Sequence, residues 1–142
     1  DQAGDTVTLD RYRGRPVSVT FAYAHCETVC PLIVNDVLNA RDRLGARRPA
    51  VLIVTLDPWR DTPSRLPSIA ARWGVGGDAH VLSGSPEQVE RVLNAWRIPR
   101  ARNERTGDLS HPSLAYVLGP DGRIAYAVSG SEALIRAAVE AL

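Results

Sequence analysis

The chain has 142 residues, 44% of them hydrophobic, which is enough for one globular domain with a sizeable core. Its formal net charge is +1 and its charged residues are interspersed, so it has no broad electrostatic attraction to nucleic acid or acidic membranes. All 17 basic side chains are arginine, which excludes enzymes that need a lysine for a Schiff base or a phosphate-binding P-loop.

The first half of the chain predicts a strand, a helix and a second strand. Continuous apolar runs rich in β-branched and aromatic residues, at 15–24 and 50–58, are typical of strands buried on both faces. Between them, apolar residues recur at helical spacing over 31–45, with Pro31 at the start and Gly45 at the end.

The second half continues the alternation with a helix, a strand, a helix, a hairpin around a Pro-Asp-Gly turn, and a last helix. These elements are predicted at 61–74, 79–84, 85–98, 113–128 and 131–142. Ser85 and Gln88 form a predicted capping box at the start of the third helix. The polar stretch 99–112 is expected to be a long loop. The whole pattern indicates an α/β domain with a mixed sheet.

Cys26 and Cys30 are the only cysteines of the chain, and they lie too close in sequence for a disulfide between them to stabilise the fold much. Proline favours the first position of a helix and disfavours helical torsions in the residue before it. Pro31 therefore predicts Cys30 at the helix N-cap and Cys26 in the preceding loop. The positive end of the helix favours thiolates there. The pair suits a reversible disulfide or a soft metal ion, and two inert buried cysteines are the alternative.

A third metal ligand has three candidates, because the chain contains three histidines. Two thiolates and one imidazole suit Cu(I), whereas structural zinc needs a fourth ligand. His25 adjoins Cys26, but neighbouring side chains at a strand end point to opposite faces. His80 begins a strand and belongs to no motif, so a packing role is the simpler interpretation. His111 ends the polar loop, where the following strand can bring it toward the cysteines.

Four stretches of the chain occur in an order that resembles a known family. They are FAYAHCETVCP, TLDPWRDTP, LSGSPEQVERVLNAW and SHPSLAYVLGPDGRI. Together they resemble the successive signatures of the Sco/SenC family, copper-handling proteins with a thioredoxin-like fold that assist cytochrome c oxidase. The opening stretch, DQAGDTVTLDRYRGRPV, is similar to the family's N-terminal hairpin. The resemblance implies one thioredoxin-like domain over 1–142, with a mixed central β-sheet flanked by helices and an N-terminal β-hairpin extension.

The resemblance also implies site residues. Cys26, Cys30 and His111 match the family's copper ligands, and Asp57 and Asp61 match two acidic residues near the metal loop. For the two aspartates, turn formation and helix capping are simpler roles than metal ligation.

Two departures from the family pattern concern the metal loop. Glu27 and Thr28 replace the usual Pro-Asp between the cysteines, which predicts a less rigid loop. Pro112 follows His111 at a position where thioredoxin-like folds often have a cis-proline, and a cis bond would change the direction of the histidine. A cis-proline there would also favour redox chemistry at the cysteines.

The resemblance implies a copper metallochaperone rather than an enzyme. It would hold Cu(I), with Cu(II) as the other state, and deliver copper to the dinuclear copper site of cytochrome c oxidase subunit II. The alternative is a thiol-disulfide oxidoreductase in which Cys26 and Cys30 reduce the copper-site cysteines of that subunit. His111 separates the two, because metal binding needs it and disulfide exchange does not. A thioredoxin-like peroxidase is disfavoured, since Val19 and Tyr23 stand where that class has proline and threonine.

The expected location is outside the cytoplasm. No apolar run approaches the roughly 20 residues that cross a bilayer. The chain contains no methionine, so an N-terminal segment is expected to have been lost. The family resemblance implies that this segment is a membrane anchor, and it also implies the location outside the cytoplasm. Other copper carriers and thioredoxin-like reductants are further partners that the resemblance allows, and nucleic acid is not expected.

Overall fold

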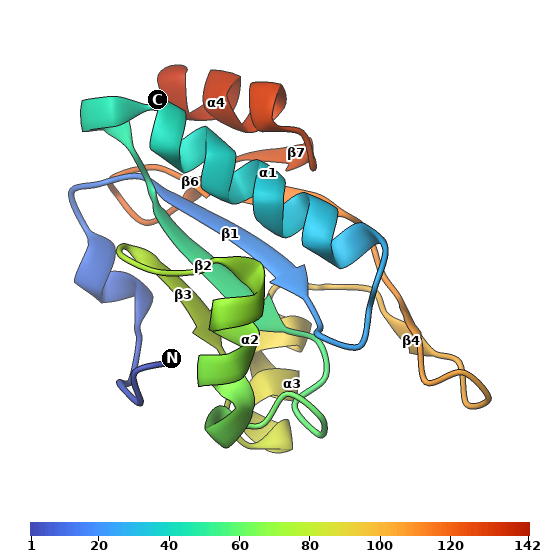
Figure 1. Cartoon of the computed structure of the whole chain (residues 1–142). Helices are drawn as coiled ribbons and strands as arrows, with labels where there is room; N and C mark the ends of the chain where they lie inside the picture. The colour runs from blue at the N-terminus through green and yellow to red at the C-terminus, as the bar shows by residue number, and fades with distance from the viewer.

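A five-stranded mixed sheet forms the centre of the computed structural model, which describes all of residues 1–142 (Figure 1). The strand order is β3-β2-β1-β6-β7. Three strands are parallel: β1 (Val17–Ala22), β2 (Ala50–Thr55) and β3 (Ala79–Leu82). Next to β1, the β6 strand (Leu114–Leu118) is antiparallel, and the edge strand β7 (Ile124–Ser129) pairs antiparallel to β6. The predicted α/β architecture with a mixed sheet is confirmed.

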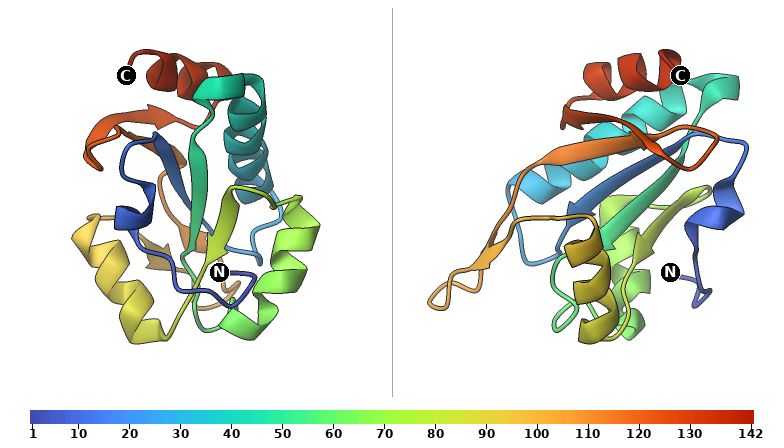
Figure 2. Two further views of the ribbon diagram at one scale, coloured as in Figure 1. Left: turned by 90° about the vertical axis from the view of Figure 1, so that its left-hand side faces the viewer. Right: turned by 180° about the vertical axis from the view of Figure 1, so that it is seen from behind.

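Helices cover both faces of this sheet (Figure 2). On one face, α1 (Val29–Arg43) packs against α4 (Glu132–Glu140), and α2 (Leu66–Trp73) lies over β3. On the other face lie α3 (Pro86–Ala95) and the N-terminal segment. Every residue of β1 and β2 is buried as a result, which explains why their sequences are almost continuously apolar. None of the helices combines the length and the hydrophobicity that crossing a bilayer requires.

The start of α1 differs from the prediction. Its N-cap is Thr28, so Cys30 lies in the first helical turn and is not the N-cap residue. The backbone N–H groups of a first turn have no partner within the helix, so Pro31 costs no hydrogen bond at the third helical position. Burial of the Cys30 side chain, which is 0% exposed, accompanies this earlier start.

The start of α3 follows the sequence signals, whereas the start of α2 differs. The capping box of Ser85 and Gln88 is present at the start of α3, with both hydrogen bonds formed. A 3-10 turn, η3 (Pro63–Arg65), precedes α2, so the α-helix itself begins later than the predicted start at 61.

The N-terminal β-hairpin is not confirmed, because residues 1–16 contain no strand. They form turns and one 3-10 helix, η1 (Leu9–Tyr12). The Gln2 side chain donates to the Ala79 carbonyl and accepts from the Val81 N–H, so an amide side chain contacts the edge strand β3 where a backbone strand was expected.

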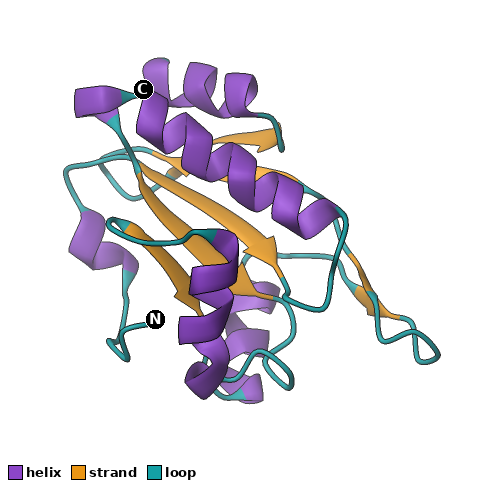
Figure 3. Ribbon diagram, in the orientation of Figure 1, coloured by secondary structure: helices purple, strands orange, loops and turns teal.

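The polar stretch 99–112 is more ordered than the long loop that was predicted. Two short antiparallel strands, β4 (Ala101–Arg102) and β5 (Leu109–Ser110), form a ribbon that projects from the domain near the start of α1 (Figure 3). His111 follows β5 directly. The ribbon therefore determines where this histidine lies.

Candidate metal centre

Three parts of the fold bring the predicted ligands together. Cys26 lies in the loop after β1, Cys30 in the first turn of α1, and His111 at the end of the ribbon. The Sγ of Cys30 is 3.7 Å from Nε2 of His111, and the Sγ of Cys26 accepts the Cys30 N–H at 3.4 Å. A pocket of about 660 Å³, which we call the thiol pocket, opens over Cys26 and His111 and is also lined by Glu27 and Thr28.

The orientation of His111 suits a metal ligand. Its Nδ1 lies 2.9 Å from the Pro112 carbonyl oxygen, and since a carbonyl only accepts, Nδ1 carries the proton. The unprotonated Nε2 is then the atom that faces Cys30, as in histidines that bind a metal through Nε2. Burial lowers the pKa of His111, and the bond to Pro112 only partly opposes this, so the neutral imidazole is favoured. All peptide bonds are trans, so the cis form considered for Pro112 is wrong.

The two thiols differ in acidity. Burial disfavours the Cys26 thiolate, but the backbone N–H groups of Cys30, Thr28 and Val29 and the Cys30 thiol together lower the pKa of Cys26 to about 7. Burial raises the pKa of Cys30 to about 12 despite a hydrogen bond from the Tyr23 backbone, and the adjacent Cys26 sulfur adds to the increase. Near neutral pH, Cys26 is therefore the sulfur that ionises.

The donor set matches Cu(I), since two sulfurs and one imidazole nitrogen are the soft ligands that this ion prefers. Cys30 and His111 already lie side by side. No three His, Cys, Asp or Glu side chains stand at metal-coordinating separation in the structure. Closure around copper therefore requires the Cys26 side chain to turn from the Cys30 N–H toward His111, and the exposed Glu27 and Thr28 leave room for that movement.

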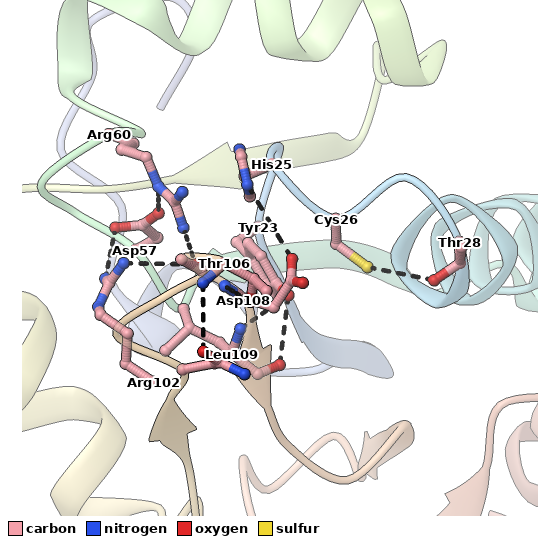
Figure 4. A network of polar contacts seen from close by, with 12 residues as sticks. Tyr23, His25, Cys26, Thr28, Asp57, Arg60, Arg102, Thr106, Asp108 and Leu109 are labelled. Atoms are coloured by element: carbon pink, nitrogen blue, oxygen red, sulfur yellow. Dashed lines mark hydrogen bonds and ion pairs between the residues drawn. The ribbon is translucent and has the colours of Figure 1, made fainter.

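Asp57 does not contact the thiols. It is 0% exposed, and its carboxylate pairs with Arg60 and, at 3.0 Å, with Arg102 (Figure 4). Arg102 belongs to β4, and Arg60 also donates to the Gly107 carbonyl in the ribbon. Asp57 thus attaches the ribbon that carries His111 to the end of β2. Sequence reasoning missed this role, because the arginines of a polar, arginine-rich stretch are usually solvated.

Asp61 stabilises the backbone just before the cysteine loop. Its Oδ2 accepts the Ala24 N–H at 3.1 Å and the Thr55 hydroxyl at 2.8 Å, and the residue is 3% exposed. Burial raises the pKa of this carboxyl group. The two hydrogen bonds connect the ends of β1 and β2 just before the loop that carries Cys26.

Tyr23 is a further residue that sequence reasoning missed. Its hydroxyl accepts the Leu109 N–H at 2.9 Å and donates to the Leu109 carbonyl at 3.3 Å. Its ring meets the His111 ring edge to face, with centroids 5.9 Å apart. Tyr23 therefore holds β5 against the end of β1. No sequence signal beyond a tyrosine at the end of a buried strand indicates this contact.

The other two histidines form no hydrogen bond with either sulfur, although His25 is among the residues that line the thiol pocket. His25 is about half exposed and lies 4.0 Å from Asp108. The buried His80 is 2.9 Å from the Asp1 carboxylate, near the N-terminus.

Comparisons with known proteins agree on one family. The SCO1/SenC family model matches residues 1–142. The SCO1 protein homolog of Bacillus subtilis is 28% identical over 137 residues, which cover 93% of this chain and 71% of that protein. Bradyrhizobium japonicum ScoI, solved with copper bound, is 26% identical with a TM-score of 0.79, covering 99% of this chain and 93% of that one. Arabidopsis thaliana ScoI, also solved with copper bound, has a TM-score of 0.85 at 18% identity, covering 99% and 94%.

The chain is shorter than several of its relatives, and it spans 42% of the human mitochondrial SCO1 homolog. The structural agreement confirms the thioredoxin-like fold that the sequence predicted. Since the family model matches from the first residue to the last, the chain belongs to the SCO1/SenC family.

Proposed function

We propose that this domain binds one Cu(I) ion through Cys26, Cys30 and His111 and delivers it to the dinuclear copper site of cytochrome c oxidase subunit II. The observation that carries the proposal is the 3.7 Å approach of Cys30 Sγ to an unprotonated His111 Nε2, with the Cys26 sulfur beside them. Relatives solved with copper bound support it. Delivery outside the cytoplasm, from a domain held at a membrane by a preceding segment, belongs to the same proposal.

The three ligands have different roles in this proposal. Cys26 lines the thiol pocket and is partly ionised near pH 7, so it captures the ion first. Cys30 is buried and protonated, and it must release its proton as the second sulfur binds. His111 needs no proton transfer, because its Nε2 lone pair is already directed at Cys30. Ligands of a partner reach the ion from the Cys26 side, where the pocket is open.

An anaerobic Cu(I) titration of the reduced protein against a competing chelator tests the proposal. We expect one tightly bound equivalent, weakened by orders of magnitude in His111→Ala. The matched control is His25→Ala, since His25 adjoins Cys26 in sequence without facing Cys30. Loss of tight binding in the control, or binding that is indifferent to His111, would contradict the ligand set.

A thiol-disulfide oxidoreductase is the second candidate, and the separation of the two thiol pKa values favours it. The Cys26 thiolate would attack one sulfur of a partner disulfide, forming a mixed disulfide and releasing one partner thiolate. Cys30 would then lose its proton to that thiolate and attack the Cys26 sulfur, which breaks the mixed disulfide and releases the second partner sulfur as a thiolate. The products are a Cys26–Cys30 disulfide and a reduced partner. Exchange that survives in His111→Ala while copper binding is lost would identify this activity.

A further inference from the structure

A second hollow lies beside the cysteine loop, on the side of α2. Its volume is about 340 Å³, and its wall is mostly charged. The charged and titratable residues that line it are His25, Arg60, Asp61, Arg65 and Arg72. We call it the arginine hollow, and it is separate from the thiol pocket.

One face of α2 supplies much of this wall. Arg65 is the N-cap of the helix, and Ser68 and Arg72 follow it by three and seven positions. Side chains at this spacing share one helix face, and all three are exposed. The helix therefore presents two guanidinium groups to the same hollow.

The charges of Arg65 and Arg72 have no acidic partner in the protein. Arg65 Nη1 donates to the Arg60 carbonyl at 3.3 Å, and Arg72 Nη1 donates to the Ala24 carbonyl at 3.2 Å. Neither side chain takes part in an ion pair. A guanidinium group has five N–H donors, so most of those on Arg65 and Arg72 are unused.

The nearby acidic groups are already engaged. Asp57 is buried and pairs with two other arginines. Asp61 is 3% exposed, and its Oδ2 accepts hydrogen bonds from Ala24 and Thr55. The arginine hollow is therefore a local positive site in a chain whose formal net charge is only +1.

The hollow lies next to the ionisable thiol. His25 lines both the hollow and the thiol pocket. The carbonyl that receives Arg72 belongs to Ala24, two residues before Cys26. The hollow is therefore within reach of a protein segment that brings a metal ligand or a disulfide to Cys26.

We infer that the arginine hollow is a carboxylate subsite for the protein partner, in which an Asp or Glu near the partner's reacting cysteine enters between Arg65 and Arg72. The inference rests on the proposed function, because it requires a partner that docks at Cys26. Guanidinium groups pair bidentately with carboxylates, and the volume is at the small end of ligand pockets, which suits one side chain. Because both arginines are exposed, the effect is on orientation and association rate, and salt weakens it.

Thiol exchange with two synthetic peptides tests the inference. Each peptide carries one cysteine activated as a disulfide with 2-thiopyridine, and the two differ only in a Glu or a Gln two residues from that cysteine. The Cys26 thiolate attacks the peptide sulfur and forms a mixed disulfide, and the departing pyridine-2-thiolate takes up a proton to give pyridine-2-thione, whose absorbance reports the rate. At low ionic strength we expect the Glu peptide to react about fivefold faster with the wild-type protein.

The double variant Arg65→Gln, Arg72→Gln should react with both peptides at nearly equal rates. The Gln peptide reports the reactivity of Cys26 itself in every variant, so the ratio of the two rates isolates the subsite. The matched control is Arg91→Gln, because Arg91 is an exposed arginine without an ion pair on α3, across the sheet. This control should keep the wild-type preference.

Two outcomes would overturn the inference: a wild-type protein with no preference for the Glu peptide, and a double variant that keeps the preference. If the preference is absent while inorganic phosphate shifts the Arg65 and Arg72 side-chain NMR signals, the hollow is a site for free anions. A failed wild-type copper titration would instead refute copper binding and leave the peptide ratio readable.

Discussion

The different acidity of the two thiols predicts selective alkylation of Cys26 in the reduced, copper-free protein. The pKa of Cys26 is lowered from 9.0 to about 7, so about half of it is thiolate at pH 7, against about 1% for an unperturbed thiol. A thiolate of lower pKa is also a weaker nucleophile, and two units cost about 6- to 10-fold in rate. Cys26, which is 8% exposed, should therefore react about 5- to 8-fold faster at pH 7 than an unperturbed cysteine of the same accessibility.

Cys30 should be almost unreactive under the same conditions. Its pKa of about 12 leaves a thiolate fraction of about 10⁻⁵ at pH 7, and its side chain is 0% exposed. The assay is a short pulse of iodoacetamide at a series of pH values, followed by mass spectrometry with fragment-ion mapping of the two cysteines. Labelling of Cys30 before Cys26, or a Cys26 profile with its midpoint near pH 9, would refute this account of the site.

Three further predictions concern the residues that support the site. Asp57→Asn should lower the free energy of unfolding by about 3 kcal/mol in urea denaturation, because it leaves two arginine charges without their buried partner. Asp10→Asn is the control: it breaks the exposed ion pair with Arg13 and should change the free energy of unfolding much less. Tyr23→Phe leaves the Leu109 backbone unpaired, so it should lower the free energy of unfolding by about 1 to 2 kcal/mol. It should also weaken Cu(I) binding in the chelator titration without slowing alkylation of Cys26. An unchanged copper affinity would count against a role of Tyr23 in positioning His111. Burial lowers the pKa of His80 and outweighs the Asp1 carboxylate 2.9 Å away, so the unfolded state binds its proton first and stability should fall as the pH drops below 6.5. His80→Gln should flatten that fall in denaturation curves, and an unchanged slope would contradict it.

Much of the fold could be predicted because the local sequence patterns match the burial of these segments in the structure. The continuous apolar runs of β1 and β2 indicate strands covered on both faces, and the capping box at Ser85 marks the start of α3. The proposed ligands, Cys26, Cys30 and then His111, could also be named from the sequence, because the chain has few soft donors and its motifs resemble those of the family.

The predictions that failed concern segments whose conformation depends on distant contacts. The N-terminal segment contacts the edge of β3 through the Gln2 side chain, and nothing in its own sequence requires a hairpin. Cys30 enters the helix because its side chain is buried in the core, which outweighs the mild local bias of Pro31.

The sequence by itself determined the order of strands and helices and the set of soft donors, because both follow from local pattern and residue chemistry. Only the tertiary structure decided where His111 lies. The contacts that hold its ribbon, Asp57 with Arg102 and Tyr23 with Leu109, join residues 45 and 86 positions apart. Contacts at such separations form only when the sheet brings strand ends together, and a buried carboxylate or hydroxyl then requires a partner that no local pattern specifies.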